Sequence, residues 1–159
     1  MNLIYDLFKH MNWADALMWQ SVLKTPTAVE DRTVLEQLHH IHLCQHAWLL
    51  IWKGKAVDAK AGENFDILNL KKWACLYYED VFNYLASIQE SDLERVVNVP
   101  SIEKPLHLPS LRETFIQITT HSNYHRGQLI KCLRGIGGVP LQTDFIKWVF
   151  LGKPNPDWS

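Results

Sequence analysis

The sequence has only three cysteines, and no two of them form a C-x-x-C pair. An odd number of isolated cysteines in a chain of 159 residues argues against a disulfide framework and indicates a reducing compartment. We therefore expect a cytoplasmic protein. Each cysteine falls within an apolar helical pattern, which predicts three small, buried hydrophobic residues. They are Cys44, Cys75 and Cys132.

The chain also lacks an excess of charge, because 16 Lys and Arg residues face 17 Asp and Glu residues. Because the chain has no excess of positive charge that could hold a polyanion, we expect no nucleic-acid partner. The apolar run from Ala47 to Trp52 has only six residues, whereas a membrane span needs about 18. The N-terminal residues have no cleavable apolar region. We therefore expect neither a membrane partner nor a signal peptide.

What the chain does have is apolar material for a core: 47% of its residues are hydrophobic and seven are tryptophan. This is enough for one domain with a substantial core. Apolar residues at three- and four-residue spacing predict four long amphipathic helices and a short fifth one. We expect them over residues 3–23, 33–52, from 64–69 to 88, 110–134 and 143–151. Capping boxes at Thr33–Glu36 and Ser110–Glu113 mark two of the starts.

The segment Glu90–Pro109 interrupts this helical pattern. Its three prolines exclude a continuous helix, and its β-branched valines favour extended backbone. We expect a long crossover here, with or without a short extended hairpin. The predicted fold is all-α: a four-helix bundle with a long crossover before the fourth helix and a short C-terminal helix. The domain should occupy residues 1–151, followed by a loose tail over 152–159.

The clearest chemical signal is a pair of histidines, His121 and His125. On a helix these positions lie one turn apart on the same face, so both imidazoles can reach one metal ion. The pair replaces apolar residues in the inward stripe of its helix, where an unsatisfied polar group would cost about 1–3 kcal/mol. A shared metal ion would satisfy both. The alternative is a pair of core histidines bonded to the backbone or to each other.

A third ligand would have to come from another helix, and four of the eight histidines lie between residues 39 and 46. His40 lies beside an apolar stripe and can turn toward the bundle axis. His39 points about 100° away but remains open as the alternative, while His42 and His46 fall on outward or flanking positions. Three neutral imidazoles with a free fourth position describe a catalytic rather than a structural site. Nitrogen ligands are compatible with zinc, nickel, iron and cobalt.

The octet His121–Gln128, read as H-S-N-Y-H-R-G-Q, resembles the H-x-x-x-H-R-G-Q signature of the DinB-like family. These are the damage-inducible, metal-binding bundles also called YfiT-like. Residues 12–15 are similar to the family's N-x-W-A-N motif. Residues 40–54 are similar to the helix in which a histidine is a ligand, and residues 138–145 to its C-terminal P-x-x-T-D segment. The matches cover nearly the whole chain in the same order.

The resemblance implies a metal site formed by His40, His121 and His125, and usually a homodimer. Characterised relatives include transferases and isomerases that use low-molecular-weight thiols, so a small-molecule substrate is expected. The predicted function is a metal-dependent thiol S-transferase, isomerase or hydrolase, with zinc or nickel favoured and iron or cobalt open. The alternative is a non-catalytic metal-binding stress-response protein. No catalytic acid or base is predicted.

Several further residues carry expectations of their own. Cys44, Trp48 and His10 are candidates to line the pocket beside the metal, although a surface position is the alternative for His10. Arg126 points away from the metal face, and we expect a structural ion pair, with Asp144 as the suggested partner. The neighbouring glycine costs about 1 kcal/mol inside a helix, which suggests the close approach of another element.

Overall fold

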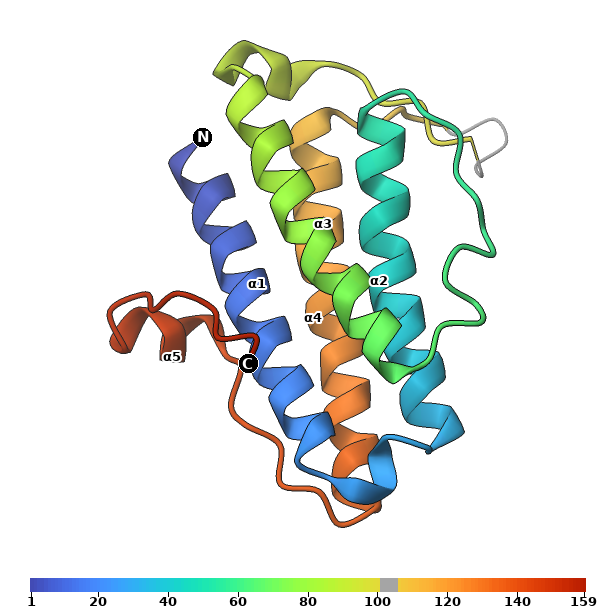
Figure 1. Ribbon diagram of the computed structural model, residues 1–159. Helices are drawn as coiled ribbons and strands as arrows, with labels where there is room; N and C mark the ends of the chain where they lie inside the picture. Colours follow the sequence, from blue (N-terminus) through green and yellow to red (C-terminus); the bar gives the residue numbers. More distant parts are fainter. Residues whose placement is uncertain (101–105) are drawn as a thin grey trace.

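The computed structural model describes residues 1–100 and 106–159, and the regular structure of these residues is helical (Figure 1). Two short 3₁₀ segments, η1 and η2, accompany the α-helices. The elements are α1 (Asn2–Leu23), η1 (Pro26–Ala28), α2 (Arg32–Trp52), α3 (Ile67–Ser87), η2 (Glu90–Glu94), α4 (Leu111–Gly135) and α5 (Phe145–Phe150). The predicted all-α bundle of four long helices with a short C-terminal helix is confirmed.

The four long helices form a closed bundle in which α4 packs against α1 and α2. α3 packs against the same two helices, so the order around the bundle is α1, α4, α2, α3. α3 and α4, although consecutive, therefore lie on a diagonal. The described parts of the connection between them, residues 88–100 and 106–110, lie at one end of the bundle (Figure 1). This arrangement brings α2 and α4, which carry the candidate ligands, into direct contact.

The start of α2 differs from the prediction. The helix begins one residue earlier, and Asp31 is its N-cap, accepting a hydrogen bond at 2.9 Å from the backbone N–H of Val34. Thr33, the predicted cap, lies inside the helix. Its predicted partner, Glu36, instead accepts a hydrogen bond from Arg32 at 2.7 Å. An aspartate is at least as good an N-cap as a threonine, and here it takes that place.

The crossover is attached to the start of α4. A single antiparallel bridge joins Val96 to Ser110, and no longer hairpin forms within the described part of the chain. The predicted capping box is confirmed: the Ser110 hydroxyl accepts from the Glu113 N–H, and the Glu113 carboxylate accepts from the Ser110 N–H. The part of the predicted crossover over residues 101–105 lies outside the described residues.

Two apolar clusters fill the interior of the bundle. One is built around Phe8 and Phe115, whose rings meet edge to face at 5.5 Å. The other contains Trp19, Leu38 and Leu129, all completely buried. The three cysteines, predicted to be buried, are only half-buried at the edges of the helices. The apolar helical stripes form the core as predicted, but they leave the cysteines accessible.

The C-terminal tail is packed, whereas the sequence predicted a loose one. The indole N–H of Trp158 donates a hydrogen bond at 2.8 Å to the side-chain oxygen of Asn12 on α1. The same indole lies 5.8 Å from the ring of Tyr78 on α3. The tail is therefore held against α1 and α3 because its tryptophan finds both an apolar surface and a hydrogen-bond acceptor there.

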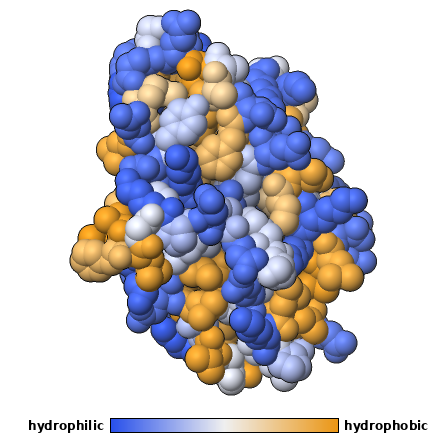
Figure 2. All heavy atoms as spheres, turned by 60° about the vertical axis from the view of Figure 1, so that its left-hand side comes forward, coloured by the Kyte–Doolittle hydropathy of each residue, from blue (hydrophilic) through white to orange (hydrophobic). Residues whose placement is uncertain are grey.

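α5 lies outside the bundle, beside α1 (Figure 1). Its Trp148 is buried against Trp13, while Ile146 and Phe150 are 55% and 79% exposed. Figure 2 brings this side of the molecule forward and shows apolar surface interrupted by polar side chains. Among the described residues, none of the helices combines the length and the apolar character needed to cross a membrane.

Candidate metal centre

Three of the predicted site residues come together between α2 and α4. The imidazole ring of His125 lies 4.4 Å from that of His40 and 4.4 Å from that of His121, and the rings of His40 and His121 are 5.5 Å apart. The Nε2 atoms of His40 and His125 are separated by 3.2 Å. Two nitrogens bound to one tetrahedral zinc ion would be about 3.4 Å apart. The two imidazoles therefore stand at a separation that suits a shared ion.

The third imidazole has an unsatisfied nitrogen. His121 Nε2 is buried and has no hydrogen-bond partner among the described residues. Leaving such an atom unpaired costs about 1–3 kcal/mol. A metal ion between α2 and α4 would give this nitrogen a partner, so the residues present fit a bound ion.

A hydrogen bond to Gln128 selects the tautomer of the His125 ring that a metal ligand needs. Its Nδ1 lies 3.0 Å from the side-chain oxygen of Gln128, one turn further along α4. Because an amide oxygen only accepts, Nδ1 must carry the hydrogen, and Nε2 keeps its lone pair toward His40. A hydrogen bond of this kind, from the far nitrogen to a neighbouring acceptor, orients most histidines that bind metals.

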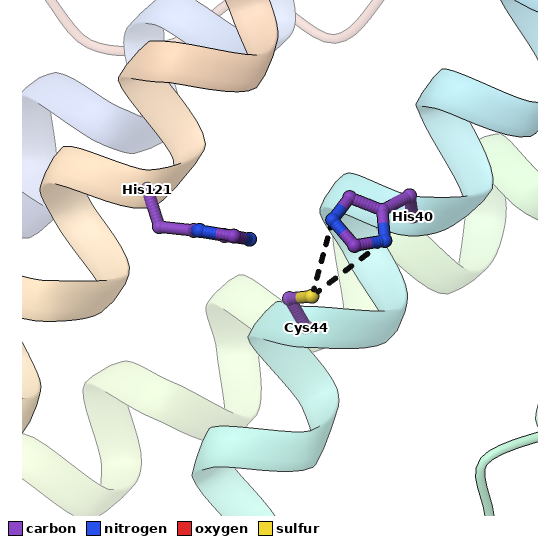
Figure 3. A group of neighbouring side chains, drawn as sticks. All are labelled: His40, Cys44 and His121. Carbon is purple, nitrogen blue, oxygen red and sulfur yellow. Dashed lines mark hydrogen bonds between the residues drawn. The ribbon is translucent and has the colours of Figure 1, made fainter.

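A thiol joins the histidines. Cys44 follows His40 by one turn of α2, and its Sγ lies 3.7 Å from His40 Nε2. The potential donor atoms of His40, Cys44 and His121 all lie within 4.8 Å of one another. Figure 3 shows His121 reaching from α4 toward the pair on α2. This group of side chains could hold a metal ion.

The site favours the forms of its histidines that bind metals. Burial lowers the pKa of His40 and of His121, and the neighbouring imidazoles lower both values further. These two rings are therefore more readily neutral at physiological pH than free imidazole. Burial also raises the pKa of the Cys44 thiol, which disfavours a free thiolate there in the absence of a cation.

The model of the DinB family matches residues 4–152 of the sequence. The chain belongs to the DinB family. It is 19% identical to Protein DinB of Bacillus subtilis (strain 168) over 163 aligned positions, which cover 94% of this chain and 95% of that protein. No solved structure gives a significant match.

Beneath the candidate ligands of this DinB-family chain lies a buried polar network. The Gln45 amide donates to Asp15 at 2.7 Å and to the Ser122 hydroxyl at 3.3 Å. The hydroxyl of Tyr78 donates to the same carboxylate, and the guanidinium of Arg126 donates to it at 2.7 Å. Each network residue on α2 and α4 is the next residue in sequence after a residue of the site: Gln45 follows Cys44, Ser122 follows His121 and Arg126 follows His125. The network therefore joins α1, α2, α3 and α4 immediately behind the site.

Two expectations for the family signature were wrong. Arg126 pairs with Asp15 rather than Asp144, because its side chain points into the bundle, where it is 1% exposed. Asp144 is instead the N-cap residue of α5. Among the described residues no other element approaches Gly127 closely, since a Cβ built there would meet nothing within 4 Å.

His42 was expected to face outward, and this was also wrong. The side chain is completely buried. The indole N–H of Trp19 donates to His42 Nε2 at 2.9 Å, and His42 Nδ1 donates to the side-chain oxygen of Gln45 at 2.9 Å. Both ring nitrogens are thus paired in the neutral form, and burial lowers the pKa of this histidine. Its role is to connect the apolar core to the polar network.

The remaining histidines of α2 are directed away from the metal group. His39 Nε2 donates at 2.8 Å to the carbonyl of Ala61 in the loop after α2. His46 Nε2 donates at 3.0 Å to the carbonyl of Trp73, and its ring stacks on that indole. Of the two candidates left open on α2, His40 is the one whose ring lies beside the histidines of α4.

Of the residues suggested for the pocket, His10 lies elsewhere, whereas Trp48 packs against the same apolar cluster as Cys44. His10 is 7% exposed rather than on the surface, and its Nε2 donates to the Thr143 carbonyl at 2.8 Å. It borders a separate cavity of about 230 Å³ between α1, α4 and the start of α5. Trp48 packs against Trp52 and the apolar core. Of the three suggested residues, only Cys44 belongs to the metal group, and its position four residues after His40 was the signal for it.

Proposed function

We propose that this DinB-family protein binds one divalent transition-metal ion through His40, His121 and His125. In this proposal the protein is a metal-dependent enzyme that acts on a small molecule, most specifically an S-transferase that uses a low-molecular-weight thiol. The observation that carries the proposal is the convergence of three imidazoles from two helices, one of them with a buried and unpaired nitrogen. Zinc and nickel are the favoured ions, and iron and cobalt also accept such ligands.

Three histidine ligands leave a coordination position for another group, the arrangement found in catalytic sites. When bound, the ion would favour the thiolate form of a coordinated thiol, which is the nucleophilic form. The chain's own residues would orient the ligands. Gln128 fixes the ring of His125, and the buried network behind the site holds α2 and α4 at their separation.

The second candidate is a non-catalytic metal-binding protein of a stress response. The thiol of Cys44, close to His40, favours this reading, because a permanent fourth protein ligand would close the coordination sphere. Closed sites of four protein ligands are typical of structural ions. The two candidates therefore differ in whether an outside molecule can reach the ion.

Metal analysis of protein purified without a metal-affinity tag tests the common part of both candidates. We expect one ion per chain, lost in His125→Ala and kept in His39→Ala. A conjugation screen of small thiols with a chromogenic aryl halide, with and without that metal, tests the enzymatic part. Full loading without turnover across the panel would favour the binding protein, and failure to bind any ion stoichiometrically would contradict both.

A further inference from the structure

Cys44 lies beside His40 at the separation that two donors to one metal ion would have. With zinc–sulfur and zinc–nitrogen bonds of about 2.3 and 2.05 Å, a tetrahedral ion holds sulfur and nitrogen about 3.6 Å apart. The observed distance between Cys44 Sγ and His40 Nε2 is 3.7 Å. The His121 donor atom lies within 4.8 Å of both. The distance between Cys44 and His40 is therefore that of two donors to one ion, and His121 belongs to the same group of potential donors.

The other contacts of this thiol support the same interpretation. Among the described residues, the hydrogen-bond partner of Cys44 Sγ is the ring of His40, itself a candidate ligand. Cys75 and Cys132 are also half-buried but belong to no comparable group of donors in the described part of the chain. These two thiols therefore serve as controls.

We propose that Cys44 supplies the fourth donor to the ion in the resting protein, and that a substrate thiol enters by replacing it. This inference rests on the proposed function, because it requires the ion held by the three histidines. The exchange is balanced: the entering thiol loses its proton, and the released Cys44 thiolate takes one up. No oxidant or reductant is involved.

The exchange has a consequence for specificity. A thiolate is a soft ligand that binds zinc, nickel and cobalt well, so water or a carboxylate competes poorly for a position that Cys44 holds. Another thiolate offers the same type of bond and can replace it. Cys44 would thus admit thiols to the ion in preference to other small molecules.

Cobalt(II) substitution tests this assignment through a readout other than activity. A cysteine thiolate bound to cobalt(II) gives a near-ultraviolet charge-transfer band that imidazole ligands do not give. We expect the band in the wild-type protein and in Cys75→Ala. Cys44→Ala should still bind one cobalt ion through the histidines, without the band and at least about tenfold more weakly. Adding β-mercaptoethanol to Cys44→Ala should restore the band, because the small thiol takes the vacated position.

Each alternative outcome has a distinct meaning. A stoichiometric wild-type cobalt complex without the band would overturn the assignment of Cys44 while leaving the three-histidine site intact. A band that persists in Cys44→Ala without added thiol would do the same. A Cys44→Ala complex that gains no band at saturating β-mercaptoethanol would overturn the exchange. Failure of the wild-type protein to bind cobalt would instead contradict the proposed function itself.

Alkylation by iodoacetamide, followed by mass spectrometry, provides an independent check. Cys44 should be labelled at different rates in the metal-free and the metal-bound protein, because coordination replaces the proton of the thiol with the ion and so changes the reactivity of the sulfur. Cys75 should be labelled at the same rate in both states. Equal labelling of Cys44 with and without a bound ion would overturn its role as a ligand.

Discussion

The carboxylate of Asp15 on α1 accepts a hydrogen bond at 2.7 Å from the guanidinium of Arg126 on α4, and both side chains are at most 1% exposed. Arg126 directly follows His125 on α4 and points about 100° around the helix from it. Charges are costly to bury, so each of the two depends on the other for compensation. Removing either partner should therefore destabilise the bundle, and the pair joins α4 to α1 beside the turn that carries His125.

Breaking this pair from one side should be strongly destabilising. We expect Asp15→Ala to lower the free energy of unfolding by about 3–5 kcal/mol, because Arg126 is left buried without a counter-charge. Urea denaturation followed by circular dichroism measures the change. Arg32→Ala, which breaks the exposed pair with Glu36, is the control and should change stability little. Similar losses of unfolding free energy in both variants would show that the buried pair contributes no more to stability than the exposed one.

The ligand assignment predicts a specific pattern of metal loss. His121→Ala and His125→Ala should each weaken metal binding by more than about a hundredfold, since losing a ligand costs more than losing its orienting partner. Helical content should be retained, because the apolar core does not depend on these rings. His39→Ala, on the same helix as His40, should keep its ion. Loss of metal in His39→Ala together with retention in His40→Ala would reverse the choice on α2.

Gln128 should raise the metal affinity of the site by orienting His125, although it is not itself a ligand. In Gln128→Leu, Nδ1 of His125 loses its acceptor, and the ring is no longer held in the orientation that directs Nε2 toward His40. We expect metal affinity to fall about 10–100-fold, as is usual when the hydrogen-bond partner of a ligand is removed. Gln128→Glu, which keeps an acceptor, should retain most of the affinity. Calorimetric titration with zinc distinguishes the two, and equal affinities would argue against an orienting role.

Metal should stabilise a protein that is already folded. Excess ion binds the native site but finds no preformed site in the unfolded chain, so at 100 times its Kd it adds about 2.7 kcal/mol. The Tm should rise by several degrees in a thermal scan, and His125→Ala should show no such rise. The metal-free protein should remain helical because its core is apolar throughout. Complete unfolding on chelation would point to a structural ion.

Acid should destabilise the metal-free protein partly through His46. Burial lowers the pKa of this side chain to about 4, against an opposing contribution from its hydrogen bond to the Trp73 carbonyl. The unfolded chain takes up a proton near pH 6.5 and the folded chain only near pH 4. Between these values the unfolded state binds more protons, so the free energy of unfolding falls as pH decreases, by up to about 3 kcal/mol.

The variant His46→Gln isolates this contribution, since it removes the titrating ring and keeps an N–H donor for the same carbonyl. Urea denaturation of both proteins at pH 7.5 and pH 4.5 gives the measurement. The first pH lies about one unit above the pKa of the unfolded state, and the second lies about half a unit above the pKa of the folded state. The wild type should lose more stability than the variant over this interval. Identical losses in the two proteins would mean that His46 does not titrate in this way.

Much of the fold and part of the site could be predicted from local sequence. The helices follow from apolar spacing, and the Ser110–Glu113 capping box uses residues only three positions apart. The pairing of His121 with His125 on one face is a property of any helix. Such features need no knowledge of the rest of the chain, because the interactions that produce them are formed within one or two turns.

What only the tertiary structure decided depends on contacts between distant residues. The spacing on α2 could not separate His40 from His39 decisively, because the choice depends on the rotation of α2 against α4. The partner of Arg126 is Asp15 on α1, which lies 111 residues away in sequence, and not the suggested Asp144. Cys44 became a candidate donor because packing of α2 on α4 brings His121 to the same point. Local sequence determines the faces of each helix, whereas the packing of the four helices determines which faces meet and so which side chains can share one ion.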